Sequence, residues 1–147
     1  MTAIPATPKI AQWRTALPFW MSLGLVPVAI VAAVYGGWFI ALVPLSTWYL
    51  FSALDYVVGK NTGNPDTNTP ENQLFWYRLI TLIWPPLQIV TIFGILAYVT
   101  ATGHLAGWEE WALFAALGIL SGTIGIVYSH ELMHQKPRIE RWLADIL

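Results

Sequence analysis

The sequence contains no cysteine among its 147 residues. A chain without cysteine has no disulfide, no thiol nucleophile and no thiolate metal ligand. This absence excludes the small secreted modules that disulfides hold together. A metal site in this chain has to use the nitrogen or oxygen ligands of other side chains.

Charge is scarce as well. Charged residues make up 10% of the chain and hydrophobic residues 56%, whereas a typical soluble domain has about 25% charged residues. The formal net charge is −1, so the chain has no excess of positive charge with which to bind nucleic acid. The composition therefore excludes a water-soluble globule, a disordered chain and a nucleic-acid-binding protein.

Long uncharged runs take the place of the missing charges. They cover residues 15–54, 79–108 and 111–130. About 20 apolar residues in a helix cross the hydrocarbon core of a bilayer, so the first run is long enough for two crossings. We therefore predict an all-α fold, a helical membrane protein with about four transmembrane helices, in a single integral membrane domain over residues 1–147.

The predicted helices cover about 17–35, 38–54, 79–101 and 111–135, with a polar loop over 55–78. Gly36-Gly37 predicts a tight turn between the first two helices, and Pro85-Pro86 predicts a kink in the third. The first helix could also be read as the apolar core of a signal peptide. Such a core spans about 7 to 15 residues, whereas this run continues without a break.

A short amphipathic helix is predicted after Pro137, because proline disfavours helix at the residue before it. Apolar residues recur there at the helical spacing i, i+3, i+4 and i+7, and charged residues lie around them. The apolar residues are Ile139, Trp142, Leu143 and Ile146, and the charged ones are Arg138, Glu140, Arg141 and Asp145. We expect this C-terminal helix to lie on the membrane surface.

The positive charges predict the orientation in the membrane. With four crossings, all seven lysines and arginines fall on one side, and the two short connections on the other side have none. These residues are Lys9, Arg14, Lys60, Arg78, Lys136, Arg138 and Arg141. Positive charge marks the cytoplasmic side, so both termini are expected in the cytoplasm.

Two histidines carry the chemistry of the predicted fourth helix, near its cytoplasmic end. His130 and His134 are four residues apart, so they share one helix face at about 6 Å along the axis. Two imidazoles at this spacing can bind one metal ion or two adjacent ions. Polar groups in membrane helices are costly, which makes a functional role the default hypothesis. The alternative is that both histidines only cap the helix end at the level of the lipid headgroups.

The same residues match the zinc-protease pattern H-E-x-x-H, with Glu131 between the histidines. In such proteases the glutamate is the general base for a zinc-bound water. A third ligand would have to come from another membrane helix, and Asp55 is the only candidate on the appropriate side.

Small residues form a narrow stripe on the histidine helix. They are Gly118, Gly122, Gly125 and Ser129, and the first two form a G-x-x-x-G pair. Such stripes allow another helix to approach closely, so we expect a tight helix contact at Gly122.

Two further residues are weaker candidates for a functional site. His104 lies in the short loop on the outer side, and we interpret it as a solvent-exposed loop residue. Trp48 lies in the predicted second helix, where an aromatic residue usually only packs. It could instead line an apolar channel if the substrate is a hydrocarbon.

The stretch 125–134, followed by Arg138 to Trp142, resembles the first histidine box of the bacterial membrane alkane 1-monooxygenases. Leu54-Asp55, Gly59 and Asn64-Pro65 resemble the loop between the second and third helices of that family. The resemblance covers nearly the whole chain in the same order. This sequence has Met133 and Gln135 where the family box often has glycine and lysine, which concerns the subgroup rather than a ligand.

The resemblance implies a non-haem di-iron enzyme of the bacterial inner (cytoplasmic) membrane. That family hydroxylates the terminal carbon of alkanes with O₂ and receives electrons from rubredoxin, which rubredoxin reductase reduces. His130 and His134 match the two metal ligands of the first box. From its position beside His130, we propose that Glu131 orients a ligand ring or acts as an electrostatic partner of the metal site. We propose that Trp48 lines the substrate channel.

The family has further histidine-rich boxes that this chain lacks. Two iron ions of four to six ligands each need roughly eight or more ligand atoms, which two imidazoles cannot supply. We therefore expect the chain to be the amino-terminal part of a longer enzyme and to be inactive alone.

Three alternatives remain open at this point. A membrane fatty-acid desaturase or another hydroxylase uses similar histidine boxes. An intramembrane zinc protease would bind one zinc ion, and a non-catalytic membrane scaffold would bind no metal. The basic residues after the fourth helix could attract an acidic redox protein or acidic membrane lipid.

Overall fold

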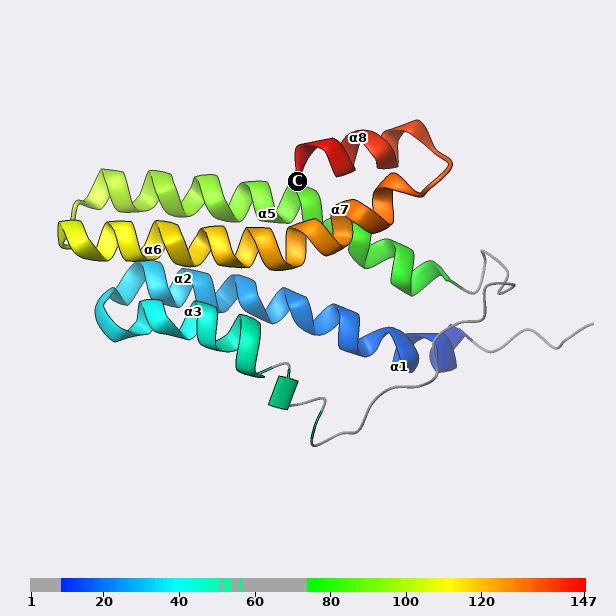
Figure 1. The fold of residues 1–147 in the computed structure, drawn as a ribbon, viewed down its shortest axis with the longest axis horizontal. Coiled ribbons are helices and arrows are strands. Elements are labelled where there is room, and N and C mark those ends of the chain that lie inside the picture. The colour runs from blue at the N-terminus through cyan, green and yellow to red at the C-terminus, as the bar shows by residue number, and fades with distance from the viewer. Residues whose placement is uncertain (1–8, 51, 54–55, 57–73) are drawn as a thin grey trace, which may run out of the picture.

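The computed structural model describes residues 9–50, 52–53, 56 and 74–147, and every regular element in these ranges is helical (Figure 1). The predicted all-α class is therefore confirmed for the described part of the chain. Most of the polar loop predicted over 55–78 lies outside the described residues, and so do Asp55, Gly59 and Asn64-Pro65.

The elements follow one another as helices and helical turns. The first arm consists of α1 (Lys9–Trp20), the 3₁₀ turn η1 (Met21–Gly24) and α2 (Leu25–Tyr35). A turn then leads to three short elements: η2 (Gly37–Ala41, 3₁₀), α3 (Leu42–Leu45) and η3 (Ser46–Leu50, a π-helix). The second arm consists of α5 (Phe75–Thr102), α6 (Gly107–Leu120), η5 (Ser121–Gly125, a π-helix), α7 (Ile126–Met133) and α8 (Arg138–Ile146).

Three helical stretches of the described chain are long and apolar enough to cross a membrane: Ala16–Tyr35, Phe75–Thr102 and Gly107–Met133. They overlap the first, third and fourth predicted helices. The expected second crossing over 38–54 is not among them. The described residues of this segment, 37–50 and 52–53, are helical, and residues 51 and 54 lie outside the described part of the chain. A second crossing over 38–54 therefore stays a prediction. Pro44 lies in this segment and removes a backbone donor, which limits regular helix there.

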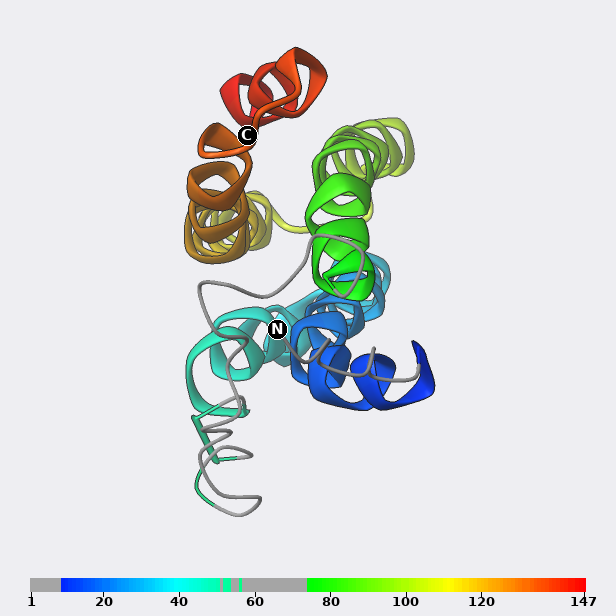
Figure 2. The same ribbon diagram turned by 90° about the vertical axis from the view of Figure 1, so that its right-hand side faces the viewer.

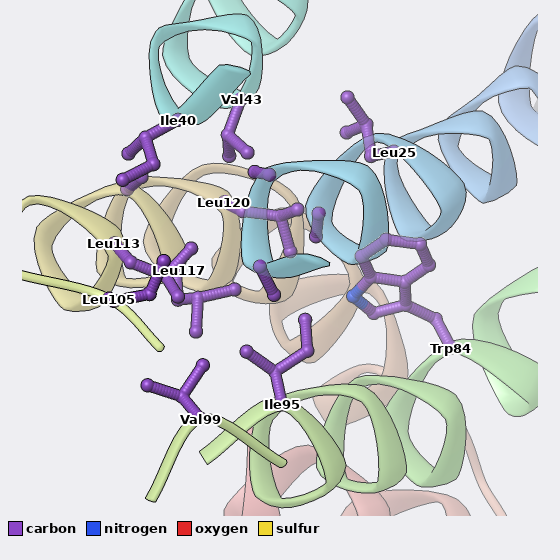
Figure 3. Close-up of a cluster of buried hydrophobic side chains, with 14 of the residues drawn as sticks. Leu25, Ile40, Val43, Trp84, Ile95, Val99, Leu105, Leu113, Leu117 and Leu120 are labelled. Atoms are coloured by element: carbon purple, nitrogen blue, oxygen red, sulfur yellow. The ribbon is translucent and has the colours of Figure 1, made fainter. Parts of the chain in front are cut away.

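The core lies where α2, η2 and α3 meet α5 and α6 (Figure 3). Small side chains on α2 (Ala29, Ala32 and Ala33) are fully buried and let the neighbouring helices approach closely. Leucine, isoleucine and valine side chains of α5 and α6 fill the space between them. Pro85 and Pro86 lie within α5, which continues through the pair and changes direction after its first turns (Figure 1).

One end of the bundle is closed by two short connections. Gly36 and Gly37 have φ values of 62° and 53°, as the predicted tight turn requires. The Gly37 backbone N–H donates to Glu109 Oε1 at 2.6 Å, and the Ala106 N–H donates to Glu109 Oε2 at 2.7 Å. A single carboxylate thus joins the α2–η2 turn to the start of α6.

The other end carries α1, α7 and α8. The predicted C-terminal helix is confirmed as α8, which folds back against α7 and α5 (Figure 2). Its apolar residues Ile139, Trp142 and Ile146 face outward and are exposed, whereas Glu140 is only 4% exposed. The outward apolar side supports the expected contact with the membrane surface, which stays a prediction.

An ion pair that sequence reasoning missed holds α8 in place. Arg78 at the start of α5 pairs with Glu140, and its Nε donates to the two carboxylate oxygens at 3.1 and 3.2 Å. The Ser129 hydroxyl adds a hydrogen bond of 2.9 Å to the Ala144 carbonyl, which joins α7 to α8.

We predict that Glu140→Ala lowers the free energy of unfolding by about 2 kcal/mol, because the substitution leaves the half-buried Arg78 without its carboxylate. Denaturant unfolding in detergent micelles measures the change. The matched control is Asp145→Ala on the exposed side of the same helix, which should have little effect. Equal stabilities of the two variants would contradict the assigned role of the ion pair.

Candidate functional site

The two histidines lie at the end of the second long helical stretch of the second arm. The elements α6, η5 and α7 form a helical stretch over Gly107–Met133. His130 lies in the last turn of α7, and His134 is the residue that caps its C-terminus. They are therefore at the end of the bundle where α7 meets α8 (Figure 1).

The imidazole rings of His130 and His134 lie next to each other in an edge-to-face arrangement. Their centroids are 4.8 Å apart, and the ring planes cross at 79°. Both side chains are exposed, and in the described part of the chain no hydrogen bond joins either ring to a neighbour. Their nitrogen lone pairs are thus accessible to a metal ion from outside the bundle.

Glu131 points elsewhere. Its Oε1 accepts a hydrogen bond of 3.1 Å from Gln135 Nε2, one turn further along the chain. Within the described residues it makes no hydrogen bond to either imidazole, so its role in orienting a ligand stays a prediction. The same residues contain no group of three or more histidine and carboxylate side chains that could hold a metal ion. Two imidazoles alone offer a partial coordination set.

Behind the histidine helix lies a buried polar network that sequence reasoning missed. Gln88 on α5 is 4% exposed; its Oε1 accepts a hydrogen bond from Trp84 Nε1 at 2.7 Å, and its Nε2 donates to Ser121 Oγ at 2.8 Å. The sequence does contain a signal for this network, which is Gln88 itself. A glutamine within an apolar membrane helix needs a hydrogen-bond partner inside the protein.

The close helix contact is at Gly125, and the expectation of a tight contact at Gly122 is wrong. No atom lies within 4 Å of the position that a Cβ would take at Gly122 or Gly118. At Gly125 that position is 2.9 Å from Gln88 Oε1 and 3.0 Å from Gln88 Nε2. The physical reason is η5, because a π-turn takes more residues than an α-turn and changes the face on which later residues lie.

The histidine helix is also joined to the first arm. The Tyr128 hydroxyl donates to the Phe19 carbonyl at 3.0 Å and lies 2.9 Å from the Ser22 hydroxyl. The rings of Tyr128 and Trp84 pack in an edge-to-face arrangement, with centroids 5.7 Å apart. Contacts to both α5 and the first arm therefore hold α7 two residues before His130.

Two other candidate residues, His104 and Trp48, make no hydrogen bond or ring contact with the histidine pair in the described part of the chain. His104 is exposed in the α5–α6 connection, as expected, and its Nε2 is 3.0 Å from the Ala33 carbonyl, so it links that connection to α2. Trp48 lies on η3 and is about half exposed. Asp55 lies outside the described residues.

An apolar groove of about 580 Å³ opens at the opposite end of the bundle, between η2–α3 and α6. Trp38 and Trp108 stand at this groove, and alanine, isoleucine and proline side chains complete its lining. It is separate from the histidine pair, which lies at the other end of the α6–η5–α7 stretch.

No protein family model and no solved structure matches this chain. Several curated proteins, however, are similar to it in sequence. Alkane 1-monooxygenase 2 of Pseudomonas aeruginosa is 32% identical over 149 residues, which cover 94% of this chain and 35% of that protein. Alkane 1-monooxygenase 1 of the same organism is 36% identical over 103 residues, which cover 64% of this chain and 25% of that protein.

Alkane 1-monooxygenase of Pseudomonas putida is 29% identical over 146 residues, which cover 97% of this chain and 32% of that protein. The chain thus spans between 25% and 35% of the length of these relatives. Several relatives with the same activity in their names match most of the chain, and the helical membrane fold agrees with the resemblance of the histidine segment. The chain therefore belongs to the alkane 1-monooxygenase family.

Proposed function

We propose that this chain supplies the first two metal ligands, His130 and His134, of a membrane enzyme that hydroxylates alkanes at the terminal carbon with O₂. The observation that carries the proposal is the pair of accessible imidazoles, 4.8 Å apart, in a chain whose relatives are named alkane 1-monooxygenase. The proposal includes a single integral membrane domain in the bacterial inner membrane, with both termini in the cytoplasm.

The donor set fits two non-haem iron ions only in part. Imidazole nitrogen is a suitable ligand for iron, and both rings are exposed on one side of α7. The remaining ligands have to come from residues outside the described part of the chain. When bound, the iron supplies the activation of O₂ for the hydroxylation.

The protein residues hold and orient the ligand rings. A metal-bound imidazole usually donates its second ring N–H to a carboxylate or carbonyl, which sets its tautomer. Glu131, next to His130, is the nearest carboxylate in the sequence and is our candidate for this role once the coordination set is complete. Rotation of its side chain away from Gln135 would be required.

An alkane offers no polar group for recognition. It can be selected only by shape and by burial of its methylene groups, at roughly 0.8 kcal/mol each. We propose that Trp48, half exposed on η3, lines the apolar path that leads the chain-like substrate from the bilayer toward the metal site.

Electrons must reach the same end of the bundle. Lys136, Arg138 and Arg141 lie there beside the histidines, and Arg138 and Arg141 are exposed. We propose that this basic group attracts acidic partners, with rubredoxin, reduced by rubredoxin reductase, as the electron donor and acidic lipid headgroups as competitors.

The metal content and the product together test the proposed activity. We expect the complete enzyme that contains this chain to hold two iron ions per polypeptide, by elemental analysis, and to form 1-alkanol from octane with rubredoxin, its reductase and O₂. The 147-residue chain alone should form none, because its coordination set is partial. One zinc ion per polypeptide and peptide cleavage would replace the proposal with the zinc protease, and a desaturated product would replace it with a desaturase.

The ligand role of the imidazole pair can be tested on the chain itself. His134→Ala should weaken Co(II) binding in detergent by about tenfold or more, because a chelating pair becomes a single ligand. The matched control is His104→Ala, a histidine at the other end of the bundle, which should leave the affinity unchanged. Isothermal titration calorimetry measures both. An equal loss in both variants would show that metal binding is not centred on α7.

The substrate-path role predicts a change in chain-length range. In the complete enzyme Trp48→Ala should extend hydroxylation to longer alkanes, because the path gains the volume of an indole ring. Trp38→Ala, which removes another exposed tryptophan at the far end of the bundle, is the control and should leave the range unchanged. Gas chromatography of the alkanols from a series of alkanes gives the comparison. An unaltered product profile in Trp48→Ala would refute the assignment.

A further inference from the structure

We propose that Gln88 is a positioning residue whose side-chain amide holds the π-turn η5 and thereby sets the face of the helix on which His130 and His134 lie. The proposal deepens the function proposed above and rests on it for the metal readout. The positioning itself is a property of the chain and can be measured without metal.

The first argument is the double contact of one amide with both ends of η5. Gln88 Nε2 donates to Ser121, the first residue of the π-turn. The same amide lies against the backbone of Gly125, the last residue of that turn, at the distance where a Cβ would clash. An α-turn over the same residues would change the distance between Ser121 and Gly125. The Gln88 amide can therefore contact both residues only in the π conformation.

The second argument is the orientation of the amide. Trp84 Nε1 donates to Gln88 Oε1 at 2.7 Å, which leaves the Nε2 side of the amide directed at Ser121. Trp84 is fully buried, and Gln88 is nearly so. Because unpaired polar groups are costly in such surroundings, this arrangement is strongly preferred over a rotated amide.

The third argument is the helical register beyond the turn. An α-helix advances about 100° per residue, so one residue gained or lost in η5 rotates all following side chains by roughly that angle. His130 and His134 follow η5 directly on α7. Their common direction relative to α5, and to any ligands elsewhere, therefore depends on the conformation of residues 121–125.

Two glycine substitutions in the same π-turn make a matched test. Gly125→Ala places a methyl group against the Gln88 amide, whereas Gly122→Ala adds the same methyl group where no atom lies within 4 Å. Because the chain has no cysteine of its own, nitroxide labels can be attached at Phe93→Cys on α5 and Met133→Cys on α7, both exposed positions.

Pulsed dipolar spectroscopy of the labelled 147-residue chain in lipid nanodiscs then measures the distance between the labels. We expect Gly125→Ala to shift it by about 5 Å or more, as a rotated α7 requires, and Gly122→Ala to leave it unchanged. In the Gln88→Ala background, Gly125→Ala should cause no further shift, because the methyl group no longer meets the amide. Equal distances in all five proteins, or a shift from Gly122→Ala as large as that from Gly125→Ala, would overturn the proposal.

The complete iron-loaded enzyme gives the functional readout. Gly125→Ala should lower the iron content about tenfold and alter the Mössbauer spectrum of the iron that remains, and Gly122→Ala should keep both. Thermal unfolding separates a displaced site from an unfolded protein. If the wild-type enzyme holds no iron while the label distances shift as expected, the metal function fails and the positioning role of Gln88 stands.

Discussion

Polar groups that are buried in an apolar bundle must find their partners inside the protein, because the hydrocarbon of a bilayer offers none. Among the described residues, several buried polar side chains join elements that are distant in the sequence. Gln88 connects α5 to η5, Tyr128 connects α7 to the first arm, and Glu140 connects α8 to α5. The apolar residues provide the bulk of the packing, but these bonds determine how the helices are rotated and where they end.

The bundle is consequently different at its two ends. At one end Glu109 joins two short connections, and the glycine turn leaves little room for change. At the other end α7 stops at two exposed imidazoles, and α8 folds back on charged and polar bonds while its apolar side faces outward. A partial metal site needs both properties. The bundle must hold the imidazoles in place, and the end that carries them must stay open to ligands from other parts of the enzyme.

The relatives of this chain indicate an activity, whereas its own side chains show how much of a metal site it contains. The relatives are named for alkane hydroxylation and are about three to four times as long as the matched region. The histidine pair accounts for only part of the coordination that a di-iron centre requires. In our proposal the chain therefore supplies the part of the site that is built on a single helix, and the contacts of Gln88 explain how that helix obtains its direction.

Composition and spacing alone determined the helical membrane class, the glycine turn at Gly36-Gly37, the C-terminal helix and the common face of His130 and His134. These features depend on local geometry and on runs of apolar residues, which a sequence displays directly. Tertiary structure decided the ion pair of Glu140 and the close contact at Gly125 instead of Gly122. Each of these depends on a partner from a distant segment or on the extra residue of a π-turn, and a regular 3.6-residue period does not predict either.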